Sequence, residues 1–209
     1  NGLTTPTQIQ AQAIPQLLAG RDVVGQSQTG TGKTAAFSLP ILERIDVSRT
    51  EVQALILTPT RELAVQVCQA IRDFNIDRHL WILPVYGGQA IERQTRRLKQ
   101  GVHIVVGTPG RIIDLMERGE LKLNEVSWLV LDEADEMLSM GFIDDVEKIL
   151  KQVPTERQTA FFSATMPPVI RELVAKFLRS PITVSVEQPK AAPKQINQVA
   201  YTVPRGWTK

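Results

Sequence analysis

The sequence predicts an α/β protein with a mostly parallel sheet and helices on both faces of that sheet. Short apolar runs recur along the chain and are continuous rather than alternating, as expected for strands covered on both sides. Between these runs, apolar residues recur at spacings of three and four, which predicts helices with one buried stripe. Strand and helix therefore alternate, and this order is typical of βαβ units.

Seven segments are predicted as strands. They are residues 22–24, 54–57, 82–86, 103–106, 128–131, 159–162 and 183–186. The helical stripes are Leu63, Val67, Ala70, Ile71 and Phe74; Ile112, Leu115 and Met116; and Ile170, Leu173, Val174, Phe177 and Leu178. An earlier helix is expected to open at residues 6–10 and to be interrupted by Pro15, with Gly20 closing the next turn. We expect one domain over residues 1–186, followed at 187–209 by an interdomain linker and the truncated start of a second lobe.

The composition is that of an ordinary globular protein. With 43% hydrophobic residues, 13 Gly and 13 Pro in 209 residues, collagen-like, low-complexity and wholly disordered chains are excluded. The net charge of +2 is small, so any nucleic-acid binding must depend on local placement of charge. The single Cys68 cannot form an internal disulfide, which favours a cytoplasmic protein. No apolar run approaches the roughly 18 residues of a membrane span, and we expect no membrane partner.

A glycine-containing turn follows the first predicted strand and leads into a helix. Such a turn points backbone N–H groups into one concavity, which suits a polyphosphate. The residues expected to line it are Gln28, Thr29, Gly30, Thr31, Gly32, Lys33 and Thr34. Lys33 would place its charge near the β- and γ-phosphates, and the Thr34 hydroxyl would ligate Mg²⁺. The general pattern has Gly where this chain has Ser27. A plain glycine-rich turn is the alternative, and the strand before it and the helix after it argue against that alternative.

An acidic segment, 132–135, follows the apolar run 128–131. In a protein with a phosphate loop, a carboxylate at a strand tip supplies the second contact to Mg²⁺. We therefore expect Asp132 to hold the metal through water and Glu133 to orient and deprotonate the attacking water. A solvated helix N-terminus would also favour three acids in four residues, but the buried strand and the phosphate loop favour the catalytic interpretation.

The sequence Asp-Glu-Ala-Asp at 132–135 spells the motif that names the DEAD-box RNA helicases, and the chain resembles the N-terminal, RecA-like lobe of that P-loop NTPase family over about residues 2–186. Gly2 and residues 6–10 resemble its Q motif, which implies that Gln10 recognises adenine. The family's phosphate loop tolerates Ser at position 27. The resemblance also implies that Asp135, Ser163 and Thr165 couple the ATP state to RNA, that Lys33, Asp132 and Glu133 are catalytic, and that ATP and Mg²⁺ are the cofactors.

Three further segments look like the family's RNA-backbone motifs. They comprise Pro59, Thr60, Arg61, Gly87, Gly88, Thr108, Pro109, Gly110 and Arg111. Helix starts that carry a hydroxyl and a guanidinium suit a phosphate, and paired glycines let one approach the backbone. Ordinary capped helices are the alternative for each segment taken alone. No side chain here is placed to read a base, so we expect contacts with RNA that do not depend on its sequence. The basic run Arg93, Arg96, Arg97 and Lys99 is either a solvated helix face or a rim that steers RNA.

The resemblance implies ATP hydrolysis coupled to local RNA strand separation, together with a second RecA-like lobe of the same parent chain. Alone, these 209 residues are expected to be monomeric, to bind adenine nucleotide weakly and to show little RNA-stimulated hydrolysis. Two alternatives remain: a nucleotide- and RNA-binding module without catalysis, and a small-molecule kinase. Glu133 argues against the first, and the RNA-backbone segments would have no purpose in the second. Cys68 is expected to be a packing residue, and His79 and His103 lack the spacing of zinc ligands.

Overall fold

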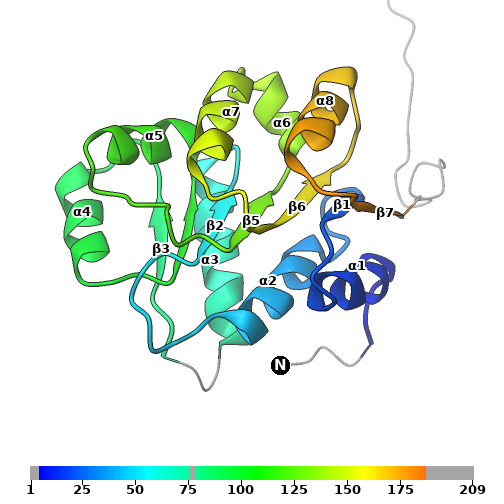
Figure 1. Ribbon diagram of the computed structural model, residues 1–209, viewed down its shortest axis with the longest axis horizontal. Coiled ribbons are helices and arrows are strands. Elements are labelled where there is room, and N and C mark those ends of the chain that lie inside the picture. The colour runs from blue at the N-terminus through cyan, green and yellow to red at the C-terminus, as the bar shows by residue number, and fades with distance from the viewer. Residues whose placement is uncertain (1–4, 76–78, 187–209) are drawn as a thin grey trace, which may run out of the picture.

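The computed structural model describes residues 5–75 and 79–186, in which a central sheet lies between two layers of helices (Figure 1). The strands are β1 Val23–Gln26, β2 Ala54–Leu57, β3 Ile82–Val85, β4 Ile104–Gly107, β5 Trp128–Leu131, β6 Gln158–Ser163 and β7 Ile182–Ser185. All strand pairs of this sheet are parallel, in the order β3-β4-β2-β5-β6-β1-β7. The predicted parallel sheet is confirmed, with several strand ends shifted by one or two residues.

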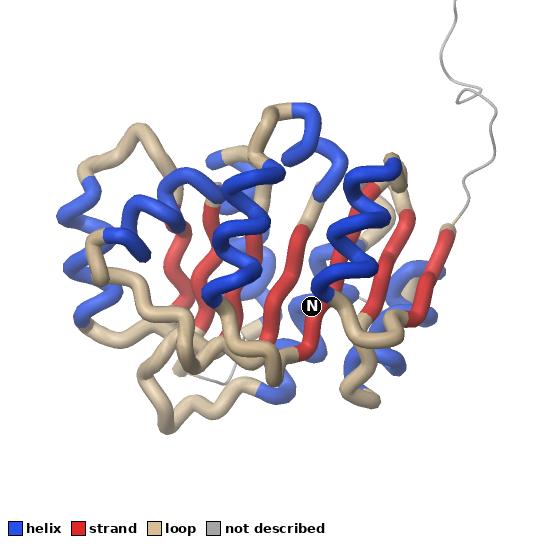
Figure 2. Tube along the Cα trace, turned by 45° about the horizontal axis from the view of Figure 1, so that its top comes forward, coloured by secondary structure: helices blue, strands red, loops and turns tan. Residues whose placement is uncertain are grey.

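Helices cover both faces of this sheet, as Figure 2 shows. Their bounds are α1 Gln8–Leu18, α2 Lys33–Arg44, α3 Arg61–Phe74, α4 Ile91–Lys99, α5 Pro109–Glu117, α6 Ala134–Ser139, α7 Ile143–Gln152 and α8 Pro168–Phe177. The first three pack on one face and α5 to α8 on the other, while α4 lies beside the edge strand β3 (Figure 1). Within residues 5–75 and 79–186, no helix has the length and apolar character that crossing a membrane requires.

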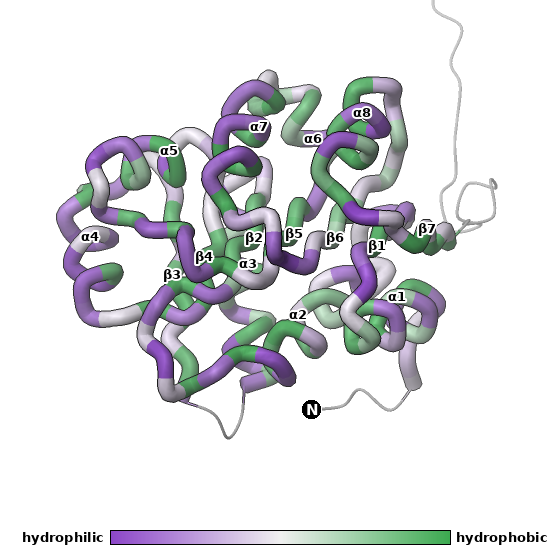
Figure 3. The backbone as a smooth tube through the Cα atoms, viewed as in Figure 1, coloured by the Kyte–Doolittle hydropathy of each residue, from purple (hydrophilic) through white to green (hydrophobic). Residues whose placement is uncertain are grey.

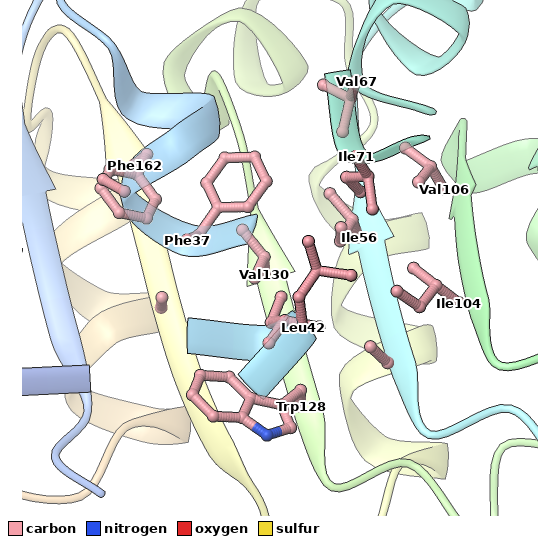
Figure 4. Close-up of a cluster of buried hydrophobic side chains, with 14 of the residues drawn as sticks. Phe37, Leu42, Ile56, Val67, Ile71, Ile104, Val106, Trp128, Val130 and Phe162 are labelled. Carbon is pink, nitrogen blue, oxygen red and sulfur yellow. The ribbon is translucent and has the colours of Figure 1, made fainter. Parts of the chain in front are cut away.

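Successive residues of each strand enter different cores. In β2, Ile56 packs with the helices of one face and Leu57 with those of the other. Figure 4 shows the first core, where the rings of Phe37 and Phe162 pack at a tilt of 49° with centroids 5.5 Å apart. The central strands are correspondingly apolar along their length in Figure 3. Continuous apolar runs were therefore a reliable sign of strands buried on both faces.

The predicted interruption at Pro15 is wrong, because α1 continues from Gln8 to Leu18. A proline lacks an N–H and leaves the carbonyl four residues earlier, here that of Ala11, without its helical partner. Both residues are exposed, so water can solvate that carbonyl. The opposite face, with Ala13 and Leu17, is fully buried and holds the helix against the sheet. Packing thus outweighs the local effect of the proline.

Gly107 ends β4 at a point where two strands approach closely. A Cβ atom there would lie 2.4 Å from the carbonyl oxygen of Val85 and 3.0 Å from Cδ1 of Ile112. We expect Gly107→Ala to lower the free energy of unfolding by about 1–3 kcal/mol, because backbone must move to make room. Urea unfolding measures this difference. Gly110→Ala is the matched control, since a Cβ at Gly110 meets nothing within 4 Å, and equal losses in both variants would contradict the steric explanation.

Candidate functional site

Apart from residues 6–10 around the start of α1, the predicted functional segments follow strands of one parallel sheet and therefore gather at one edge. The phosphate loop follows β1, the segment 163–165 ends β6, and the acidic segment 132–135 follows β5; these three strands are neighbours. The predicted RNA segments 59–61, 87–88 and 108–111 follow β2, β3 and β4, which are also neighbours. Ligands of such sheets bind at the carboxyl ends of the strands. The sheet edge is thus divided into two adjoining halves with different predicted ligands.

The phosphate loop is held by its own hydrogen bonds. Lys33 begins α2, its side chain is buried, and its Nζ donates to the carbonyl oxygen of Ser27 at 3.2 Å. Thr31 Oγ1 donates to the carbonyl oxygen of Gln28 at 2.8 Å and lies 3.0 Å from Ser27 Oγ. Ser27 therefore takes part in the internal bonding of the loop through an atom that glycine would lack.

Gln10 connects α1 to this loop. Its Nε2 donates to the carbonyl oxygen of Gly32 at 3.1 Å, and its Oε1 accepts a hydrogen bond from the Thr7 N–H at 2.9 Å. Gly32 has a φ of +94°, and a Cβ there would lie 2.4 Å from Gln10 Nε2. The amide keeps one further N–H and one further lone pair, so its contact with adenine stays a prediction. Gly2, assigned to the same motif, lies outside the described residues.

Asp132 lies directly after β5 and is only 2% exposed. Burial raises the pKa of this carboxyl to about 6, against the opposing effect of Lys33 and with a further increase from Glu133. Its Oδ1 is buried without a hydrogen-bond partner within the described residues. An unsatisfied carboxylate oxygen beside a phosphate loop fits a magnesium-bound water.

Thr34 follows Lys33 in the first turn of α2 and is half-buried. In residues 5–75 and 79–186, no group of three or more His, Cys, Asp or Glu side chains could hold a metal ion. Mg²⁺ is commonly held by one or two protein oxygens together with phosphates and water. Thr34 and Asp132 offer oxygen atoms of that kind, and their contact with Mg²⁺ stays a prediction.

Glu133 has a left-handed backbone, with φ 56° and ψ 52°. This conformation costs a residue other than glycine about 1–3 kcal/mol. Its Oε1 accepts a hydrogen bond from Thr29 Oγ1 at 3.4 Å. The acidic strand tip and the phosphate loop are therefore in direct contact, and the residue predicted to act as the general base has a strained backbone that nothing in the sequence indicates.

Asp135 joins the acidic segment to the segment that follows β6. Its Oδ2 accepts hydrogen bonds from both the N–H and the Oγ1 of Thr165, each at 2.8 Å, and its own N–H donates to Ser163 Oγ at 3.1 Å. Partial burial acts to raise the pKa of Asp135, but hydrogen bonds with Thr165 and Ser163 outweigh it and hold the pKa below its usual value. Gln26, which the sequence analysis missed, adds a bond from its Nε2 to the carbonyl oxygen of Ala164 at 3.4 Å. The three predicted coupling residues thus form one cluster.

Two arginines of the predicted RNA segments are tied to residues around Gly87 and Gly88. The guanidinium of Arg61 lies 5.0 Å from the ring centroid of Tyr86. Arg111 donates through Nη1 and Nη2 to the carbonyl oxygen of Gln89, at 3.2 and 3.3 Å. The Gln89 Nε2 in turn donates to the Tyr86 hydroxyl at 2.7 Å. Tyr86 and Gln89 were missed by the sequence analysis because their roles depend on contacts between segments far apart in the chain.

The remaining predicted RNA residues differ in accessibility. Pro59 and Pro109 are buried, so they shape the helix starts and offer no side chain to a ligand. The Thr60 hydroxyl accepts a hydrogen bond from the Leu63 N–H at 3.2 Å and caps α3, whereas the side chain of Thr108 makes no such cap on α5. A Cβ at Gly87, Gly88 or Gly110 would meet nothing within 4 Å, so the backbone there is open to a ligand.

The packing role expected of Cys68 is confirmed. Its side chain is fully buried, and burial raises the pKa of the thiol to about 12, which leaves no reactive thiolate at neutral pH. His103 is also buried, and its Nδ1 accepts a hydrogen bond from the Trp81 N–H at 2.9 Å. Phe161 and Phe162 lie in the core, as predicted.

The fold and the site together define a P-loop nucleotide-binding domain: a parallel α/β sheet with a lysine-bearing loop after β1 and a buried carboxylate after β5. The sequence model of the family described as DEAD/DEAH box helicase matches residues 7–173. The chain belongs to this family, and the expected RecA-like fold and family resemblance are confirmed.

Curated relatives and solved structures agree with this assignment. The chain is 63% identical over 208 residues to the RNA helicase CrhR of a Synechocystis strain, covering 100% of this chain and 42% of that protein. It is 52% identical to the ATP-dependent RNA helicase DeaD of Escherichia coli, covering 97% of this chain and 32% of the relative. A crystal structure of a DEAD box protein from Methanococcus jannaschii matches with a TM-score of 0.85 and 45% identity, over 87% of this chain and 50% of that one. The chain thus spans less than half the length of these two curated relatives.

Proposed function

We propose that this chain is the ATP-binding and RNA-backbone-binding lobe of an ATP-dependent RNA helicase, in which ATP hydrolysis is coupled to local separation of RNA strands. The observation that carries the proposal is the direct contact between Thr29 of the phosphate loop and Glu133 of the acidic segment. This contact brings a polyphosphate site and a candidate general base together. The relatives named above are RNA helicases, which supports the same activity for the whole protein.

In the proposed reaction, the loop binds the triphosphate. The Nζ of Lys33 gives up its hydrogen bond to the Ser27 carbonyl and donates to phosphate oxygens instead. Glu133 orients the attacking water and accepts its proton as the water oxygen bonds to the γ-phosphorus. The bond from that phosphorus to the β–γ bridging oxygen breaks in the same step, and ADP leaves. When bound, Mg²⁺ would be held by Thr34 and, through water, by Asp132, and would neutralise charge on the phosphates. A binding module without catalysis needs no base beside the metal-holding carboxylate, so the presence of Glu133 next to Asp132 argues against that alternative.

RNA would lie across the other half of the sheet edge. The open backbone at residues 87–88 and 110 and the starts of α3 and α5 would contact phosphates, independently of base sequence. A second RecA-like lobe of the same protein would close over both ligands, with residues 187–209, which lie outside the described residues, leading to it. The cluster of Asp135, Ser163 and Thr165 would then relay lobe position to the nucleotide site.

The test is the replacement of Lys33 by alanine. We expect the affinity for ATP with Mg²⁺ to fall at least about tenfold, because the charge facing the phosphates is removed. Isothermal calorimetry on the chain and on the full-length protein measures this, with Lys151→Ala on α7 as the control. Unchanged affinity would contradict the proposal. The alternative of a small-molecule kinase is tested on the same samples, by measuring whether small metabolites compete with single-stranded RNA for binding to the protein.

A further inference from the structure

A groove of about 750 Å³ lies beside β3, at the end of that strand away from Gly87 and Gly88. Its walls include Trp81, Leu83 and Pro84. Trp81 is 58% exposed, more than any other large apolar side chain in residues 5–75 and 79–186. An exposed indole ring over a groove is a surface on which a flat ligand group can stack.

The backbone under this ring is firmly held. The Trp81 N–H donates to His103 Nδ1 at 2.9 Å, and the Trp81 carbonyl accepts from the N–H groups of His103 and Ile104 at 2.9 and 3.2 Å. His103 itself is buried. The exposed ring therefore stands on a fixed part of the sheet rather than on a loop tip.

The free edge of β3 is closed to an added strand. The carbonyl of Ile82 already accepts a hydrogen bond from Arg72 Nη2 at 2.9 Å, and Pro84 has no N–H to donate. The carbonyl of Tyr86 accepts from the buried Gln94 Nε2 at 3.0 Å. An extended peptide cannot pair with this edge along its backbone, so an occupant of the groove must bind through its side groups.

The groove and the neighbouring helix are basic. Arg72 and Arg97 line the groove, and its lining contains no acidic residue. Arg93, four residues before Arg97, lies on the same face of α4 as Arg97, and Arg96 is also exposed. Within the described residues none of these three α4 arginines has an ion-pair partner, and Glu92 is the one acid on the helix.

The basic face of α4 is continuous with the proposed RNA surface. The helix begins at Ile91, just after Gly87 and Gly88, and its other end reaches the groove at Arg97. Nine helical residues span about 13 Å. A polyanion that leaves the backbone site can therefore follow Arg93 and Arg97, which have no ion-pair partner within residues 5–75 and 79–186, as far as Trp81. This continuity favours RNA over an acidic peptide as the occupant.

We propose that Trp81 and the arginines of α4 form a second contact for single-stranded RNA, in which phosphates lie along Arg93 and Arg97 and a base stacks on the Trp81 ring. This contact rests on the proposed RNA-binding function and extends the bound length of the strand. Stacking on an aromatic ring accepts any base, so the contact adds affinity and no sequence preference.

The experiment compares two RNA probes on the full-length protein, one of about six nucleotides and one of about fourteen. Trp81→Ala is expected to weaken binding of the long probe about tenfold and to leave the short probe unchanged. Trp81→Phe should retain most of the affinity, because a ring remains. Arg97→Gln should lower the slope of log affinity against log salt by about 0.7 for the long probe, whereas Lys151→Gln should not.

The long probe should also quench the part of the tryptophan fluorescence that Trp81→Phe removes. If the long probe binds equally well to wild type, Trp81→Ala and Arg97→Gln while the short probe also binds, this inference is wrong and the proposed function stands. If wild type binds neither probe, both are wrong. Binding of an acidic, phenylalanine-containing peptide that depends on Trp81, without such dependence for RNA, would show a protein partner and overturn the inference.

Discussion

Replacement of Glu133 by glutamine in the full-length protein is expected to lower the rate of ATP hydrolysis by about 10²–10⁴-fold, with little change in ATP affinity. Glutamine has nearly the same shape, and its amide oxygen can still accept the hydrogen bond from Thr29 Oγ1. It cannot accept a proton from the attacking water. Binding should therefore survive while the chemical step fails.

Phosphate release at saturating RNA, measured together with nucleotide affinity, separates these two effects. Glu136→Gln is the matched control, because Glu136 is exposed on α6 three residues further along. A Glu133→Gln variant that hydrolyses ATP at the wild-type rate would remove Glu133 from the reaction. A Glu133→Gln variant that loses ATP affinity in the same proportion as its rate of ATP hydrolysis would assign Glu133 to nucleotide binding instead.

Replacement of Asp132 by asparagine is expected to stabilise the protein at pH 8, in the absence of nucleotide and Mg²⁺, by roughly 2–3 kcal/mol. Burial raises the pKa of Asp132 from its ordinary value of 3.8 to about 6, so the folded state binds this proton more tightly than the unfolded state does. The favourable contribution is complete below pH 3.8 and is lost as the pH rises to about 6. Asparagine does not ionise, so the variant does not lose this contribution to stability as the pH rises.

Chemical unfolding of both proteins across this pH range, with EDTA present, measures the difference. It should be largest at pH 8, decrease through pH 6 and disappear near pH 4, where the wild-type carboxyl is mostly protonated. Glu117→Gln, which alters an exposed acid on α5, is the control and should show no such trend. A stability difference between the two proteins that does not vary with pH would contradict the explanation from the raised pKa of Asp132.

The fold could largely be predicted from the sequence, because the patterns that indicate its strands and helices lie within short segments. An apolar run such as 54–57 has no polar face to expose, so it predicts a strand buried on both sides. The phosphate loop was accessible for the same reason, since strand, turn and helix follow one another directly. The error at Pro15 arose because a local rule was applied where burial of Ala13 and Leu17 decides.

The site was predictable in its residues but not in its internal contacts. The bond from Gln10 to Gly32 and the stacking of Arg61 on Tyr86 join segments that only the folded sheet brings together. The left-handed backbone of Glu133 is likewise imposed by its surroundings, because local preference opposes it. Sequence patterns identify groups with suitable chemistry, whereas these contacts depend on tertiary structure.

The position of β1 has a consequence for synthesis of the chain on the ribosome. This strand lies between β6 and β7, and Asp22 just before it accepts a hydrogen bond from Thr159, 137 residues later. At about 5–20 residues per second, these 137 residues take roughly 7 to 27 seconds to synthesise, so β6 emerges that much later than β1. The nascent protein therefore cannot complete its nucleotide pocket until nearly the whole domain has been translated, and capture of ATP would mark the end of folding.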